Sequence, residues 1–204
     1  MHISLLGGSA VKVQVKPFDK DVTLVIDPIK PEKGTFVRST TADIALYTHG
    51  QKDSVTVSGN PFVIDHPGEW EISQVLIAAT PGSTEGTNLI RFDVEGMSVA
   101  HLGLEAKQLT NAQLELLGNV DILLLNVGGE PGYTPEMASK TANLVEARVV
   151  IPYGFQSDNQ PDAAPVSKFV SEMGITPEEE GNKVVIKKKD LPQENTRLIV
   201  LTKE

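Results

Sequence analysis

The sequence predicts an α/β (α+β) protein in which two β-sheets form a sandwich flanked by helices. Short strand-like runs fill the first half of the chain, whereas apolar strands alternate with helical segments in the second half. This order is typical of stacked sheets with helices outside them, because every element must bury its apolar face against another layer. The chain has 204 residues, so we expect one domain over residues 1–204.

Strand signals dominate the first half of the chain. Residues 11–15 alternate apolar and polar side chains with the period of a half-buried strand. Residues 22–26 form a compact apolar run that stops at Asp27-Pro28, which is a turn signal. Further strand candidates are separated by glycine, proline and asparagine turns. They cover residues 42–47, 55–57, 62–64, 70–78, 88–94 and 98–101.

Helix signals appear only in the second half. Thr110 can cap a helix that ends at Leu117, before Gly118. Thr134 followed by proline predicts a second helix that extends to about residue 146, and residues 163–173 predict a third. Between and after these helices, we expect strands at residues 121–125, 148–151, 183–186 and 197–201.

Composition excludes several classes of function. The net charge of −9 argues against nucleic acid as a partner, because phosphate binding relies on clustered lysine and arginine. No run of 18 apolar residues exists, so we expect no membrane span. The chain has no cysteine, which excludes disulfides and thiolate ligands. The first residues lack a basic leader and a long apolar stretch, so we expect a cytoplasmic protein.

Short segments spread over residues 1–155 together resemble the metallo-β-lactamase superfamily, in particular its compact bacterial branch related to ascorbate-phosphate lactonases. They follow the family's order and spacing. The segments are Leu5-Leu6-Gly7-Gly8-Ser9, Val25-Ile26-Asp27-Pro28, Thr41-Ala42-Asp43-Ile44, Thr48-His49-Gly50, Val63-Ile64-Asp65-His66-Pro67-Gly68-Glu69-Trp70-Glu71-Ile72, Gly86-Thr87-Asn88, His101-Leu102-Gly103, Leu109-Thr110, Val120-Asp121-Ile122-Leu123-Leu124, Val127-Gly128-Gly129 and Val149-Val150-Ile151-Pro152.

The resemblance implies an αββα sandwich with a metal site at one end of its two sheets. In that family, a His-x-His-x-Asp-His segment supplies the first metal ligands. The spacing has a physical reason, because alternate residues of an extended segment point the same way and can hold one ion together. The matching residues in this chain are His49, Gln51, Asp53 and Ser54.

The remaining ligand positions that the resemblance implies carry no metal-binding side chain. The family's next histidine, its bridging aspartate, its last histidine and a histidine of its first turn are all missing. In that order, the positions are 79–83, Leu104, Gly154 and Gly8. Only His49 and Asp53 survive, whereas a catalytic zinc needs about three protein ligands. We therefore expect a vestigial site, no catalytic residue beyond this pair and no bound metal.

Three functions remain open. The first is a non-catalytic or metal-free superfamily member, a binding or scaffold protein for an unknown small molecule or protein. The alternative is a metal-dependent hydrolase of the lactonase or phosphodiester type with an atypical mononuclear zinc or manganese site. In that alternative, His49 acts as the base and Asp53 orients it. An assembly role, including a homo-oligomer, is a third possibility.

Other residues are candidates for the pocket and its surroundings. Gly128 and Gly129 resemble the family loop at the pocket rim, and glycines there let the backbone approach a ligand; a plain strand-to-helix loop explains them equally well. We expect His101 to be structural and His66 to lie at the surface. The full set of pocket candidates is Gln51, Ser54, Leu104, Gly128, Gly129 and Gly154.

Overall fold

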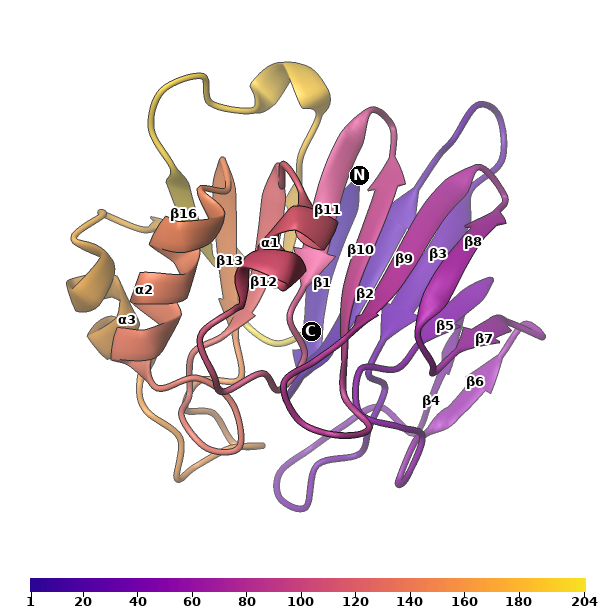
Figure 1. Ribbon diagram of the computed structural model, residues 1–204. Helices are drawn as coiled ribbons and strands as arrows, with labels where there is room; N and C mark the ends of the chain where they lie inside the picture. The colour runs from indigo at the N-terminus through magenta and orange to yellow at the C-terminus, as the bar shows by residue number, and fades with distance from the viewer.

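The computed structural model describes all 204 residues, and two stacked β-sheets form its centre (Figure 1). In spatial order, the first sheet contains β15 (Lys183–Val185), β1 (His2–Gly7), β2 (Ala10–Val15), β3 (Val22–Ile26), β5 (Ile44–Leu46) and β7 (Phe62–Ile64). The second sheet contains β14 (Glu178–Glu179), β16 (Arg197–Val200), β13 (Val149–Tyr153), β12 (Ile122–Asn126), β11 (Met97–His101), β10 (Asn88–Val94), β9 (Val75–Pro81) and β8 (Gly68–Ile72). A small separate sheet pairs β4 (Ser39–Thr41) with β6 (Thr56–Ser58).

The core lies between the two large sheets. Val13 and Leu24 of the first sheet belong to the same buried cluster as Phe92 of the second. Strand β12 is buried on both faces, as its unbroken apolar run predicts. Its alternate residues Ile122 and Leu124 face the first sheet, whereas Leu123 and Leu125 belong to a second cluster under the helices.

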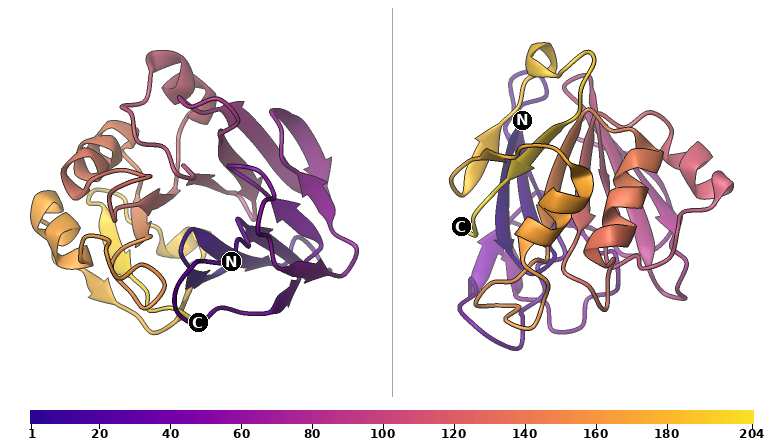
Figure 2. Two further views of the ribbon diagram at one scale, coloured as in Figure 1. Left: turned by 90° about the horizontal axis from the view of Figure 1, so that it is seen from below. Right: turned by 90° about the vertical axis from the view of Figure 1, so that its left-hand side faces the viewer.

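All three α-helices cover the outer face of the second sheet (Figure 2). They are α1 (Asn111–Leu117), α2 (Pro135–Val145) and α3 (Val166–Met173), and a short 3₁₀ helix, η1 (Lys188–Asp190), follows β15. The sandwich and its α/β class are confirmed. A helical layer on the other side, which αββα implies, is not formed. There, Phe36 and Val57 pack against a small cluster on the outer face of the first sheet.

The helix termini follow their capping residues. Thr110 accepts a hydrogen bond from the amide of Gln113 in a capping box, and α1 ends before Gly118, as predicted. The side chain of Thr134 caps α2 by accepting a hydrogen bond from the amide of Met137. Helix α3 begins three residues later than expected, because Pro165 is its N-cap and the preceding segment is a turn. None of the helices is long and apolar enough to cross a membrane.

One predicted strand is wrong. Residues 70–78 were expected to form a single strand but belong to the antiparallel pair β8 and β9. The turn between them places Ser73 and Gln74 at φ 50° and 64°. Both are left-handed conformations that hairpin turns require and that glycine or asparagine usually supplies. The sequence carries neither residue at this turn, so its usual signal is missing.

Candidate functional site

Several polar side chains gather where strands of both sheets end. Asp27 directly follows β3 and Thr48 lies just beyond β5, which runs parallel to β3. In the second sheet, His101 ends β11 and Tyr153 ends β13, and both strands are parallel to β12. The carboxyl ends of parallel strands meet at one edge, which is where α/β proteins commonly place their ligands.

Asp27 is the centre of this cluster and is completely buried. One carboxylate oxygen, Oδ1, accepts a hydrogen bond from the backbone amide of Thr48 at 2.7 Å. The other, Oδ2, accepts from the Thr48 hydroxyl at 2.5 Å and lies 3.4 Å from Nδ1 of His49. Burial raises the pKa of Asp27, but the hydrogen bonds and charge contributed by its partners outweigh burial and hold the pKa below its usual value.

His49 is fixed through one ring nitrogen. Because the Thr48 hydroxyl donates to Asp27, its oxygen can accept the proton of His49 Nδ1, which lies 2.9 Å away. Burial lowers the pKa of His49, but the hydrogen bond and charge of Asp27 outweigh burial and raise it. This arrangement leaves Nε2 as the ring nitrogen available to a ligand, on a side chain that is 22% exposed.

His101 is buried and satisfied within the protein, as expected of a structural histidine. Its Nδ1 accepts from the amide of Gly103 at 3.1 Å, and its Nε2 donates to the carbonyl of Ser9 at 3.3 Å. Its ring stacks on Tyr153 with centroids 4.7 Å apart. Burial lowers the pKa of His101 to about 4, so the ring is neutral near pH 7.

The buried His101 predicts a loss of stability in mild acid. Its pKa falls from 6.5 in the unfolded chain to about 4 in the fold, so the stabilisation is complete above pH 6.5 and is lost as the pH falls towards 4. The group accounts for a loss of about 3 kcal/mol over that interval. Urea unfolding of the protein and of His101→Gln across this pH range measures how the unfolding free energy of each depends on pH. If the two unfolding free energies changed equally with pH, this role of His101 would be wrong.

Tyr153 belongs to the same cluster and contacts the turn that follows β11. Its hydroxyl is buried and donates to the carbonyl of Gly103 at 2.5 Å. Tyr153→Phe should destabilise the fold by about 1–2 kcal/mol, because the buried carbonyl loses its donor. Chemical denaturation measures this change, and an unchanged unfolding free energy would show that the bond contributes nothing.

His49 and Asp53, the two ligands that the sequence analysis expected to survive, are not paired with each other. The expected partner of His49 was Asp53, but the structure pairs His49 with Asp27. Asp53 is exposed in a turn with φ 61°, and its carbonyl accepts from the amide of Lys30. The sequence analysis did not name Asp27 as a partner of His49, although Asp27-Pro28 was noted as a turn. The signal that could have found it is the buried carboxylate at the end of an apolar strand.

Gln51 and Ser54 make contacts that do not involve His49. The amide nitrogen of Gln51 donates to Asp65 at 2.6 Å. Asp65 also lies 3.1 Å from Nδ1 of His66, which is at the surface as predicted. Ser54 exchanges a hydrogen bond with the hydroxyl of Tyr47 at 2.9 Å.

Gly128 and Gly129 belong to a loop that is closed by its own hydrogen bonds. The amide of Gly129 donates to the carbonyl of Tyr133 at 2.8 Å, and the carbonyl of Gly128 accepts from Ala164 at 2.8 Å. Both groups are therefore engaged within the protein. This finding favours the explanation of the glycines as part of a strand-to-helix loop.

The residues at this site do not fit a zinc ion. Leu104 and Gly154 have no donor atoms, and Gln51 and Ser54 offer neutral oxygens that bind zinc poorly beside imidazole. His49 and Asp53 alone fall short of the three protein ligands that a catalytic zinc normally takes. No group of three or more histidine, aspartate or glutamate side chains in the chain has the arrangement of a metal site.

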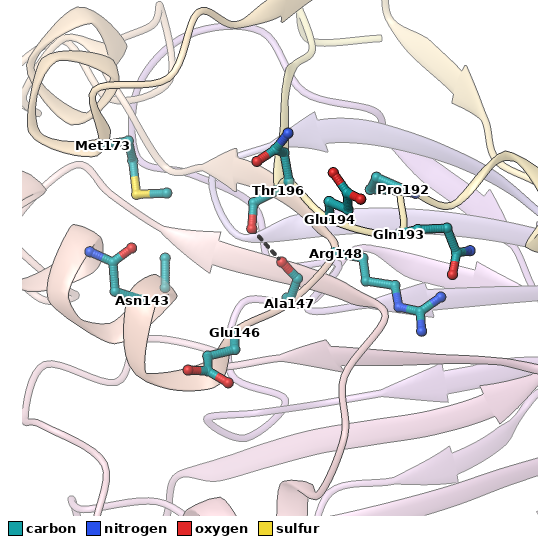
Figure 3. A pocket seen from close by; sticks show the side chains of 11 residues that line it. Asn143, Glu146, Ala147, Arg148, Met173, Pro192, Gln193, Glu194 and Thr196 are labelled. Carbon is teal, nitrogen blue, oxygen red and sulfur yellow. Dashed lines mark hydrogen bonds between the residues drawn. The ribbon is translucent and has the colours of Figure 1, made fainter.

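A cavity lies away from this cluster. It has a volume of about 430 Å³ and opens between the end of α2 and the segment 192–196 (Figure 3). Asn143 and Glu146 line it from the helix side, and Arg148 and Glu194 face them. None of the site residues expected from the sequence lines this cavity. It is found at the opposite ends of β13 and β16 from the Asp27 cluster, before these strands begin.

Comparisons with known proteins agree with this architecture. Residues 2–154 match the beta-lactamase superfamily domain, whereas no curated protein is significantly similar in sequence. The structure of a candidate zinc-dependent hydrolase of the metallo-beta-lactamase superfamily from Thermotoga maritima is 28% identical, with 98% of both chains covered and a TM-score of 0.82. A metallo hydrolase from Ignicoccus hospitalis is 17% identical over 85% of this chain and 90% of that chain, with a TM-score of 0.63. A candidate metal-dependent hydrolase from Parabacteroides distasonis is 16% identical over 97% and 91%, with a TM-score of 0.62.

Proposed function

Because the chain belongs to the metallo-β-lactamase superfamily, we propose that it is a non-catalytic member that binds a small molecule or a protein partner without a metal ion. The observation that carries the proposal is the chemistry at the ligand positions. Leucine and glycine stand at positions 104 and 154, and Ser54 is hydrogen-bonded to Tyr47. A zinc hydrolase needs several donors around one ion, because the ion must lower the pKa of its bound water.

The contacts around Asp27 hold His49 through protein groups alone. Metal-binding histidines are usually oriented by a partner on their other ring nitrogen. Here, Asp27 and Thr48 hold His49 in that way. The other ligand positions that the resemblance implies lack most of the groups that would complete a metal site around His49. The contacts of Asp27 contribute to the packing of the strand ends and need no metal to do so.

A thermal-shift experiment tests the proposal. Added zinc or manganese should leave the melting temperature of the protein unchanged, because a ligand stabilises a fold only by binding its native state. His49→Ala and Asp53→Ala should show the same indifference to metal. A metal-dependent rise in the melting temperature that both variants lose would contradict the proposal.

A metal-dependent hydrolase is the second candidate, and the Thermotoga maritima relative favours it. His49 would hold one zinc or manganese ion with Asp53 and donors from the ligand, in an atypical mononuclear site. Its Nε2 is free for that contact, because Nδ1 is bound to Thr48. Metal-dependent hydrolysis of a lactone or a phosphodiester, lost in His49→Ala, would establish this candidate in place of the first.

A further inference from the structure

We infer that the Asn126 side chain blocks the space that a metal-binding histidine at position 154 would need. Asn126 ends β12 and its side chain is buried, with only 2% of the residue exposed. Strand β13 runs alongside, and Tyr153 is the direct neighbour of Asn126 in the register. Gly154 follows Tyr153, so the Asn126 side chain lies beside the position where relatives are expected to carry their last histidine. The inference rests on the proposed function and extends it.

The space around Gly154 is closed by the Asn126 carboxamide. A Cβ atom built on Gly154 would come within 3.0 Å of the Asn126 amide nitrogen, which is closer than real Cβ atoms approach such neighbours. Gly154 also has a φ of +73°, a conformation that side chains other than glycine's rarely adopt. A histidine at this position would therefore carry backbone strain and would also clash with Asn126, and Asn126→Ala removes the clash.

Asn126 is held in place from the other side as well. Its Oδ1 accepts a hydrogen bond from the amide of Gly128 at 3.3 Å. A Cβ atom on Gly132 would also come within 3.0 Å of the Asn126 side chain. The carboxamide is thus packed between the Gly128–Gly132 loop and β13. Besides lacking metal ligands, the site is therefore partly filled by the Asn126 side chain.

Restoring ligands in the presence and in the absence of the Asn126 side chain tests this inference. The double variant L104D/G154H returns coordinating side chains to two family positions beside His49, so a third ligand is present only if the histidine at position 154 can reach the ion. It should contain no zinc by elemental analysis, and added zinc should not change its melting temperature. The same variant with Asn126→Ala should bind about one zinc per chain and show a zinc-dependent rise in melting temperature. Zinc in the double variant that keeps Asn126, or in neither variant, would overturn the inference.

A double-mutant cycle keeps the test decisive if the restored variants fold poorly. Gly154→Ala should lower the melting temperature by about 4 °C or more. In an Asn126→Ala background, the same change should cost less than half as much, because the two side chains no longer compete for one space. Equal losses in both backgrounds would show that Asn126 is no obstacle. Zinc in the unaltered protein would instead overturn the proposed function and leave the cycle unaffected.

Discussion

Replacing Asp27 by alanine should lower the free energy of unfolding by about 2–6 kcal/mol, because two hydrogen-bond donors would lose their buried acceptor and each such loss costs about 1–3 kcal/mol. Asp27 is completely buried and accepts from both the amide and the hydroxyl of Thr48. The alanine would leave both donors without an acceptor and would remove the carboxylate beside His49. Urea denaturation followed by circular dichroism measures the change.

Asp53→Ala is the matched control for this prediction. It removes a carboxylate from the same region of the fold, but Asp53 is exposed and its side chain makes no hydrogen bond within the protein. Its unfolding free energy should stay within about 0.5 kcal/mol of the parent's. If the two variants lose the same stability, the structural role that we assign to Asp27 is wrong.

Gly154→His should destabilise the protein by about 2–5 kcal/mol. The left-handed backbone at Gly154 costs a residue with a side chain about 1–2 kcal/mol. Overpacking against the buried Asn126 adds about 1–3 kcal/mol. A histidine at position 154 therefore lowers the stability of the fold. Equilibrium unfolding in urea measures the loss.

Gly8→His provides the comparison, because Gly8 is also a family ligand position with a positive φ of +60°. A Cβ atom on Gly8 would meet nothing within 4 Å, so only the backbone strain remains. The expected loss is about 1–2 kcal/mol. A Gly8 variant as unstable as the Gly154 variant would show that steric exclusion by Asn126 is absent.

Much of the fold could be predicted because local signals and the hydrophobic pattern agree. The apolar run of β12 and the caps Thr110 and Thr134 were found from the sequence alone. The hairpin turn at Ser73 and Gln74 could not be predicted, because serine and glutamine are not typical of a left-handed backbone. Tertiary packing, which a single sequence does not display, determined that turn.

The candidate site could be predicted only in part. The resemblance identified His49, but the spacing of four residues to Asp53 suggested the wrong partner. Asp27 meets His49 because β3 and β5 lie side by side as parallel neighbours, a pairing between distant segments. Asn126 was missed for the same reason, since its contact with Gly154 depends on the register of β12 and β13.

The metal content of the purified protein tests the central claim most directly. Elemental analysis of protein prepared without a chelator should find far less than one zinc or manganese ion per chain, because only His49 and Asp53 remain of the family's ligands. About one tightly held ion per chain, lost in His49→Ala, would contradict the claim that this site no longer binds metal.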